Sequence, residues 1–215
     1  SIKDKTAAGF QLAMHGNGDA AIDNILSAVA KLREEGTVLV RPRIEHCSIV
    51  QDDQLLQLKE LEVSCSFLIG HVYLWGGAFK DRVFGLEKAE KLDRTGSFER
   101  AGVPYSLHTD NAVTEFSPLE MVEIAVRREL FSEPGYILAP AERASREMAL
   151  RAITSTAAWQ LLSETEIGTL EPGKYADFVI LDGDPMTVPD DAIGDIQVLE
   201  TWVAGEQVFR FGNGL

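Results

Sequence analysis

The stretch AMHGNGDAAIDNILSAVAKL, residues 13–32, joins a short apolar segment to an amphipathic one through a histidine and two glycines. Before the glycines, apolar residues alternate over Gly9–His15, which predicts a short strand that ends in His15. After them, apolar residues recur at helical spacing, which predicts a helix over Ala20–Leu32 with Asp19 as its N-cap. A strand, a histidine and a helix therefore follow one another directly.

The same order of elements recurs three more times. The further β-rich segments are Thr37–Cys47, Val63–His71 and Val103–Asp110, followed by a helix over Gln54–Glu60, an irregular region from Tyr73 to Arg94 and a helix over Pro118–Leu130. The side chains at the strand ends that can bind a metal ion or carry a proton are His15, His46, His71, His108 and Asp110. Repeated β-then-α units predict a parallel sheet, and ligands bind such sheets at the carboxyl ends of the strands.

The spacing of these residues indicates which parallel sheet is expected. A (β/α)₈ barrel of roughly 250 residues has about 31 residues in each unit. His46 follows His15 by 31 residues, and Asp110 follows His46 by 64 residues. These steps correspond to one and two barrel units. A flavodoxin-like sheet gives similar steps and stays as an alternative.

The tail of the chain has a different pattern. Its predicted elements are a helix over Arg146–Leu162, a turn over Thr169–Lys174, and strands over Ala176–Asp182, Val198–Ala204 and Gln207–Arg210, with a hairpin loop at Gly205 and Glu206. These strands lack helices between them, which indicates a small antiparallel sheet. The sequence thus predicts a partial barrel over residues 1–165 and a small β-domain segment over residues 166–215.

Composition excludes several classes of partner. The formal net charge of −14 argues against binding to nucleic acid or to an anionic membrane and favours small-molecule or protein partners. No apolar run is long enough to span a bilayer, and the first residues do not resemble a signal peptide. Cys47 and Cys65 lie in apolar stretches without a Cys-x-x-Cys spacing, so we expect buried free thiols and a reducing, cytoplasmic location.

Several motifs in series resemble the carboxyl-terminal half of amidohydrolase family 3. They are HGNGD (15–19), RIEH (43–46), HVYLWG (71–76), HTDNAV (108–113), AITSTAAWQ (152–160) and GTLEPGKYADFVILD (168–182). The resemblance implies an α/β fold that comprises strands five to eight of a (β/α)₈ barrel and part of a composite β-sandwich domain. It also implies hydrolysis of a C–N bond in an amide, cyclic amide or N-acyl compound.

The same resemblance assigns roles to the residues at the strand ends. His15, His46 and Asp110 would be ligands of a divalent metal, zinc by preference, with one or two ions in the site. Asp110 would act as general base toward a metal-activated water. The resemblance places His71, Trp75 and His108 among the substrate contacts. Glu45 precedes His46, so we expect its side chain to point outward from the barrel and to pair with Arg41 or Arg43.

The chain also departs from the family pattern. The family's His-x-His pair does not occur, and the only histidines are the four already named. This departure motivates an alternative in which the chain is a catalytically incomplete half-barrel with a structural or interaction role, inactive by itself. An open half-barrel would expose apolar residues such as Phe10, Leu12, Val63 and Phe67. We therefore expect a homo-oligomer or pairing with an amino-terminal half.

Overall fold

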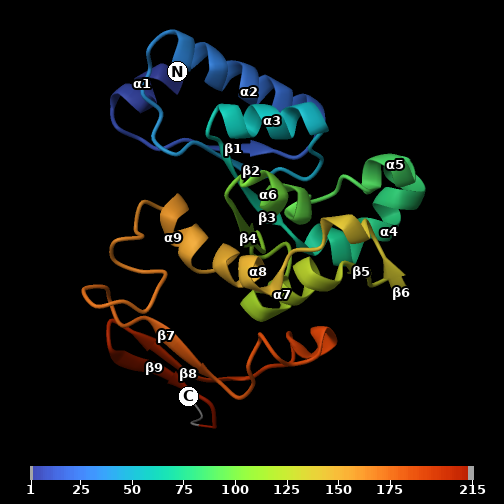
Figure 1. Ribbon diagram of the computed structural model, residues 1–215, viewed down its shortest axis with the longest axis vertical. Coiled ribbons are helices and arrows are strands. Elements are labelled where there is room, and N and C mark those ends of the chain that lie inside the picture. Colours follow the sequence, from blue (N-terminus) through green and yellow to red (C-terminus); the bar gives the residue numbers. More distant parts are fainter. Residues whose placement is uncertain (1, 213–215) are drawn as a thin grey trace.

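The computed structural model describes residues 2–212 (Figure 1). The helices are α1 Ile2–Ala7, α2 Asp19–Glu34, α3 Asp52–Glu60, α4 Gly76–Ala78, α5 Gly85–Ala89, α6 Thr95–Ala101, α7 Pro118–Arg127, α8 Arg146–Ala152 and α9 Ser155–Gln160. Short π-helical turns are η1 His71–Trp75 and η2 Phe79–Val83, and 3-10 turns are η3 Pro140–Glu142 and η4 Asp190–Ala192. The strands are β1 Ala13–Gly16, β2 Arg43–His46, β3 Ser64–Leu68, β4 Tyr105–His108, β5 Glu129–Leu130, β6 Glu133–Ile137, β7 Phe178–Leu181, β8 Val198–Val203 and β9 Glu206–Arg210.

Strands β1 to β4 form one parallel sheet, in which each strand pairs with the next along the chain. The predicted α/β class is therefore confirmed. Doubly wound sheets reverse their order at a switch point and do not place four successive strands side by side. The flavodoxin-like alternative is thus wrong. A barrel, by contrast, requires that successive strands follow one another in a single direction, as β1 to β4 do. The described sheet is open, so its membership of a closed barrel stays a prediction.

One face of the parallel sheet is covered by helices and is apolar. Ile44, Cys65 and Tyr105 lie in register across β2, β3 and β4, and all three are buried. Helix α2 lies over β1, with α3 beside it, while α7, α8 and α9 lie near β4 (Figure 1). A Cβ atom at Gly16 would lie only 2.8 Å from the Ile25 side chain. A larger residue at this position would require the Ile25 side chain of α2 to move, because α2 approaches β1 so closely.

The expected exposure of apolar residues on an open half-barrel is only partly correct. Phe67 and Val63 are buried, because Phe67 faces the helix-covered side and Val63 joins the same core cluster. Phe10 is 62% exposed in the segment before β1. The exposed apolar surface therefore lies at the β1 edge of the sheet rather than over its centre.

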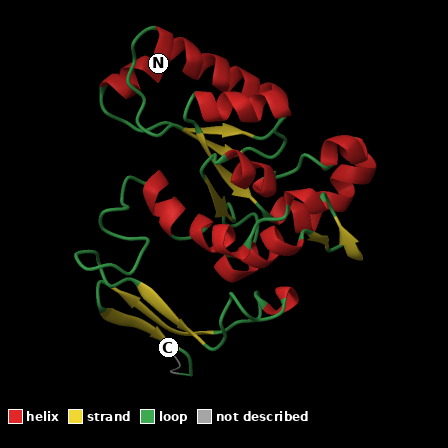
Figure 2. Cartoon of the chain, viewed as in Figure 1, coloured by secondary structure: helices red, strands yellow, loops and turns green. Residues whose placement is uncertain are grey.

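Several predicted elements are shorter than expected or interrupted (Figure 2). The first strand covers only Ala13–Gly16, and the β-rich second segment forms a strand only over Arg43–His46. The N-cap of α2 is Gly18, not Asp19, whose carboxylate accepts from the Ala20 amide and pairs with Lys88.

Two predicted helices also end earlier than expected. The single helix predicted over Arg146–Leu162 is two helices, because the backbone at Thr154 leaves the helical region at φ −128° and ψ −97°. Helix α7 ends at Arg127, where Arg128 takes a left-handed conformation with φ 57°, so that the predicted last residues form β5 instead.

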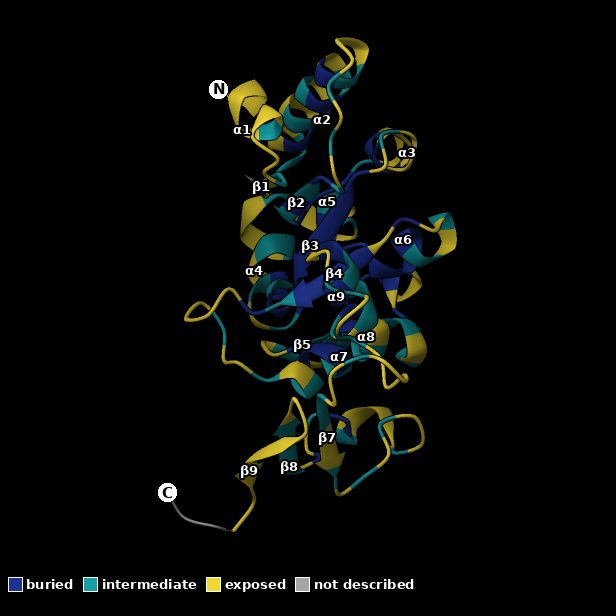
Figure 3. Ribbon diagram, turned by 90° about the vertical axis from the view of Figure 1, so that its left-hand side faces the viewer, coloured by how far each residue is buried: buried dark blue, intermediate teal, exposed yellow. Residues whose placement is uncertain are grey.

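The tail forms the predicted antiparallel sheet from β7, β8 and β9. Its hairpin loop is Ala204 and Gly205, one residue earlier than predicted, and both residues have positive φ. The sheet lies at one end of the molecule and β9 is exposed, whereas β3 and β4 form the buried centre (Figure 3). The division of the chain at residue 165 stays a prediction. Within residues 2–212 no helix has the length and hydropathy that a bilayer crossing requires.

Candidate functional site

Three of the four histidines lie together at the carboxyl edge of the parallel sheet. The ring centroids of His15 and His46 are 4.7 Å apart, and those of His46 and His108 are 5.1 Å apart. His15 lies on β1, His46 ends β2 and His108 ends β4, so neighbouring strand ends place them at one edge. The structure thus brings these three histidines together at the strand ends, and their roles stay predictions.

The backbone at His46 determines where its ring lies. By register, His46 is the partner of Gly16 and Phe67, and Phe67 is buried on the helix side of the sheet. The chain leaves the extended conformation at His46, with φ 72°, and the ring packs against His15 instead. A non-glycine residue in the left-handed region costs on the order of 1–3 kcal/mol and persists where the surrounding structure holds it. The orientation of the His46 ring toward His15 is therefore maintained against a local backbone preference.

Burial favours the uncharged form of two of these imidazoles, His46 and His108. Burial, followed by repulsion from His15, lowers the pKa of His46, and burial followed by repulsion from His46 lowers the pKa of His108. His46 Nδ1 and His108 Nε2 are buried and have no hydrogen-bond partner among the described residues. Neutral imidazole nitrogens without partners are the form in which histidine binds metal ions.

Asp110 follows β4 by two residues and is exposed. It has φ 48°, another left-handed residue at this edge of the sheet. Its negative charge acts on His46, His71 and His108, opposing the decrease of their pKa values. The carboxylate is therefore near the histidines and accessible to solvent, as a proton acceptor needs to be.

His71 lies at the start of η1, somewhat apart from the other three histidines. Its ring is 5.7 Å from the rings of both Trp75 and Phe79, in edge-on contacts. Its Nδ1 atom lies 3.0 Å from Ser48 Oγ, and Ser48 Oγ lies 2.8 Å from Asn17 Oδ1. The sequence predicted His71 and Trp75 as substrate contacts but missed Ser48 and Asn17 as partners of His71. Their positions in the sequence could have indicated them, since Asn17 follows His15 by two residues and Ser48 follows His46 by two residues.

The face of the sheet opposite the helices carries polar side chains. Glu45, Ser66 and Ser106 are in register across β2, β3 and β4. They line an open cavity of about 400 Å³ together with His108 and Asp110. Glu45 thus faces this inner cavity, so the prediction that it points outward is wrong, because the turn at His46 lets both residues reach the same side. Its predicted pairing with Arg43 is confirmed, at 2.7 Å.

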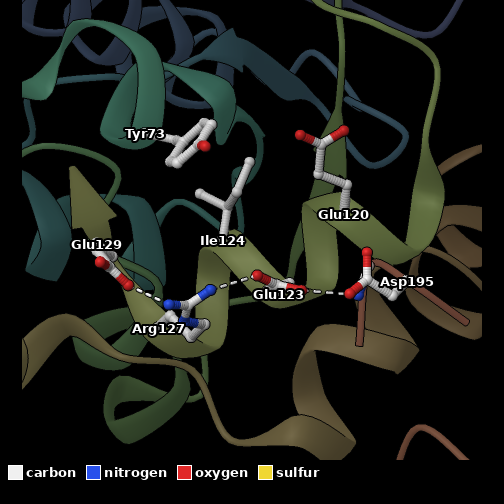
Figure 4. A pocket seen from close by; sticks show the side chains of 8 residues that line it. Tyr73, Glu120, Glu123, Ile124, Arg127, Glu129 and Asp195 are labelled. Atoms are coloured by element: carbon white, nitrogen blue, oxygen red, sulfur yellow. Dashed lines mark hydrogen bonds and ion pairs between the residues drawn. The ribbon is translucent and has the colours of Figure 1, made fainter. Parts of the chain in front are cut away.

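A second cavity, of about 300 Å³, lies between α7, Tyr73 and the loop at Gly194 (Figure 4). Glu123 binds Arg127 and accepts from the Gly194 amide, and Arg127 also binds Glu129. These paired charges form one wall of the cavity. None of the residues predicted for the site lines it, so this cavity is separate from the histidine edge.

The described residues partly fit a metal ion. Two imidazoles bound to one zinc ion, at Zn–N distances of about 2.0–2.1 Å, hold their ring centroids about 5 Å apart. Both histidine pairs have this separation. However, no three His, Cys, Asp or Glu side chains within residues 2–212 are close enough together to hold an ion. The chain therefore supplies a pair of imidazoles and a nearby carboxylate, and a complete site needs further donors.

Imidazoles and a carboxylate at the carboxyl edge of a parallel α/β sheet are typical of metal-dependent hydrolases. Residues 1–209 match the model of the amidohydrolase family, and the chain belongs to this family. The chain is 32% identical over 197 residues to the N-substituted formamide deformylase of Arthrobacter pascens. The matched region covers 92% of this chain and 36% of that protein. The chain is 30% identical to Protein LONG AFTER FAR-RED 3 of Arabidopsis thaliana, over 94% of this chain and 34% of that protein.

Solved structures agree with this assignment. An uncharacterized metal-dependent hydrolase from Pyrococcus furiosus is 31% identical and superposes with a TM-score of 0.72, over 86% of this chain and 36% of that one. A Xaa-Pro dipeptidase shares the fold at 18% identity, with a TM-score of 0.64. This chain thus spans about a third of the length of the curated relatives that it matches.

Proposed function

We propose that this chain supplies the metal-binding and proton-transfer groups of a hydrolase that cleaves the C–N bond of an amide, cyclic amide or N-acyl compound. His15 and His46 would contribute two imidazole ligands to a divalent ion, zinc by the preference of imidazole ligands, with Asp110 as the nearby carboxylate and further donors from outside the described residues. When bound, the ion supplies Lewis-acid activation of water and of the scissile carbonyl. The family membership and the formamide deformylase relative support this class of bond.

Asp110 carries the proton in the proposed reaction. Its exposed carboxylate accepts a proton from the attacking water and returns it to the leaving nitrogen, so no net proton is gained or lost. His46 and His108 near it favour the uncharged form, because burial and then repulsion from a neighbouring imidazole lower their pKa values. They therefore do not compete with Asp110 as proton donors at neutral pH. His108 and Trp75 are proposed substrate contacts at the rim.

The observation that carries the proposal is the placement of His15, His46 and His108 at one edge, with unpaired buried nitrogens on two of them. Buried polar atoms without partners cost on the order of 1–3 kcal/mol each. A ligand that binds these nitrogens removes that cost. A bound ligand therefore explains the unpaired imidazole nitrogens at the strand ends more simply than packing of the side chains does.

The remaining donors are proposed to come from outside the described residues. The sheet has open edges at β1 and β4, and apolar side chains such as Phe10 and Val38 are largely exposed beside it. Exposed strand edges and apolar patches favour association. We propose that the chain forms a homo-oligomer or pairs with an amino-terminal half like that of its longer relatives. Free, buried Cys47 and Cys65 support the proposed cytoplasmic location.

The test is formate release from an N-substituted formamide by the zinc-loaded protein. Size exclusion with light scattering separates the associated form from the monomer, and release is expected only from the associated form. Asp110→Asn should lower kcat by about 10²–10⁴-fold, because it removes the general base. Glu115→Gln, in the loop after Asp110, is the matched control and should leave the rate unchanged. Full activity of Asp110→Asn would contradict the assigned base.

A second function is favoured by one observation, the lack of a three-donor set among the described residues. In this alternative the half-barrel is catalytically incomplete and has a structural or interaction role. A zinc-loaded associated form that releases no formate and hydrolyses no N-acyl amino acid would support this alternative over catalysis.

A further inference from the structure

His71, like His108, is not used by the proposed metal and proton chemistry. Its ring is half-buried at the start of η1 and packs edge-on against Trp75 and Phe79. The charges of His46, His108 and Asp110 all act on it, so it lies near the site.

The hydrogen bonds of Ser48 determine which nitrogen of His71 carries a proton. Ser48 Oγ lies within hydrogen-bond distance of Asn17 Oδ1, at 2.8 Å, and of His71 Nδ1, at 3.0 Å. Asn17 Oδ1 can only accept, so the single hydroxyl proton of Ser48 is donated to it. Ser48 Oγ is then free to accept, and the donor to it is the Nδ1–H group of His71.

The other ring nitrogen of His71 consequently has a lone pair. Burial, followed by repulsion from His46 and then from His108, lowers the pKa of His71 to about 4, so the ring is neutral at physiological pH. A neutral ring has one N–H group, and Ser48 has fixed it at Nδ1. No described residue donates to Nε2, and Nε2 is not among the buried unpaired atoms. His71 Nε2 is therefore an accessible hydrogen-bond acceptor near the rings of Trp75 and Phe79.

We propose that His71 Nε2 is an acceptor subsite that binds an N–H or O–H group of the ligand, with Asn17 and Ser48 as the positioning residues that fix its tautomer. The apolar part of the ligand would lie against Trp75 and Phe79. This subsite selects for primary or secondary amides and against carboxylates, because a neutral Nε2 without a proton cannot donate to an anion. The substrate class of this subsite rests on the proposed amide hydrolysis. The tautomer of His71 does not depend on that proposal.

The order of the sequence links this subsite to the metal ligands. Asn17 follows His15 by two residues, and Ser48 follows His46 by two residues. The turns that orient the two proposed ligands therefore also orient His71, which comes from a third strand end. A shift of the turn after His15 or of the turn after His46 would therefore move a proposed metal ligand and His71 together.

The test is ¹⁵N–¹H long-range NMR of the histidine rings in the whole chain at neutral pH. The expected result is a protonated Nδ1 and an unprotonated Nε2 in His71. Ser48→Thr keeps the hydroxyl and should keep this tautomer, whereas Ser48→Ala should allow a mixture of tautomers. A protonated Nε2 in the unmodified protein would overturn the proposal without the use of any variant.

Ligand selectivity is tested by titration with small probes. Acetamide, which has N–H groups, should shift the His71 Nε2 resonance, while N,N-dimethylacetamide and acetate should not. Equal shifts with acetamide and N,N-dimethylacetamide would overturn the acceptor role. The proposed hydrolysis is tested separately by Asp110→Asn, since that variant leaves the tautomer of His71 unchanged whether or not the reaction occurs.

Discussion

The neutral, half-buried ring of His71 makes the protein sensitive to acid. Burial lowers its pKa to about 4 in the folded protein, whereas an unfolded chain has a histidine pKa of about 6.5. Between these values the unfolded state binds more protons than the folded state. The free energy of unfolding therefore decreases as the pH falls from about 6.5 toward 4.

The size of this decrease follows from the difference between the two pKa values. At low pH this difference lowers the free energy of unfolding by at most about 3 kcal/mol. About 2 kcal/mol of that decrease occurs between pH 7 and pH 5. This is a large part of the stability of a typical domain. The lowered pKa values of His46 and His108 act in the same direction.

A variant isolates the contribution of His71 from that of other groups. Urea denaturation at pH 7 and at pH 5 gives the loss of stability for the native protein and for His71→Gln, which cannot titrate. The variant should lose about 2 kcal/mol less than the native protein between the two pH values. If both proteins lose the same amount, or if NMR titration gives His71 a pKa near 6.5, the reasoning about its burial is refuted.

Three further outcomes are expected. Arg128→Met should lower the free energy of unfolding by about 3–5 kcal/mol in denaturant titrations, because the buried guanidinium is bonded to three backbone carbonyls that would lose their donors. Gly96→Ala should cost about 1–3 kcal/mol, since its Cβ would lie 2.6 Å from the Ala141 carbonyl oxygen. Asp110→Asn should lower kcat by about 10²–10⁴-fold with the melting temperature nearly unchanged, because its side chain is exposed.

Local patterns predicted the parts of the fold that depend on local physics. The alternation before His15 and the helical period after it gave β1 and α2, because both are set by residues within a few positions. The regular spacing of His15, His46 and Asp110 gave the order of parallel strands. The α/β class followed from this regularity, whereas the family followed from the resemblance of the motifs in series, such as HGNGD and GTLEPGKYADFVILD.

The geometry of the site could not be predicted in the same way. Alternation places Glu45 and His46 on opposite faces, and the left-handed backbone at His46 brings both to the same side. No pattern in RIEH indicates that conformation, which is stabilised by packing with residues from other strands. The link from Asn17 through Ser48 to His71 joins three loops that are distant in sequence, so only the assembled sheet reveals it.

The break between α8 and α9 shows the same limit for a helix. Residues 146–162 have helical spacing throughout, yet the chain turns at Thr154. Gln160 of α9 is thereby buried, and its Nε2 donates to the Cys65 carbonyl oxygen at 2.8 Å. A tertiary hydrogen bond of this kind overrides local helix propensity.

The most direct test of the metal-site assignment is zinc titration of the protein, followed by NMR of the imidazole rings. We expect zinc to shift the ring nitrogens of His15 and His46 together, with saturation at no more than two ions for each chain. His46→Ala should abolish the response of His15, whereas His71→Gln should leave it intact. Zinc that binds without any change at His15 and His46, or rings that do not respond to zinc at all, would contradict the assignment of these two residues as ligands.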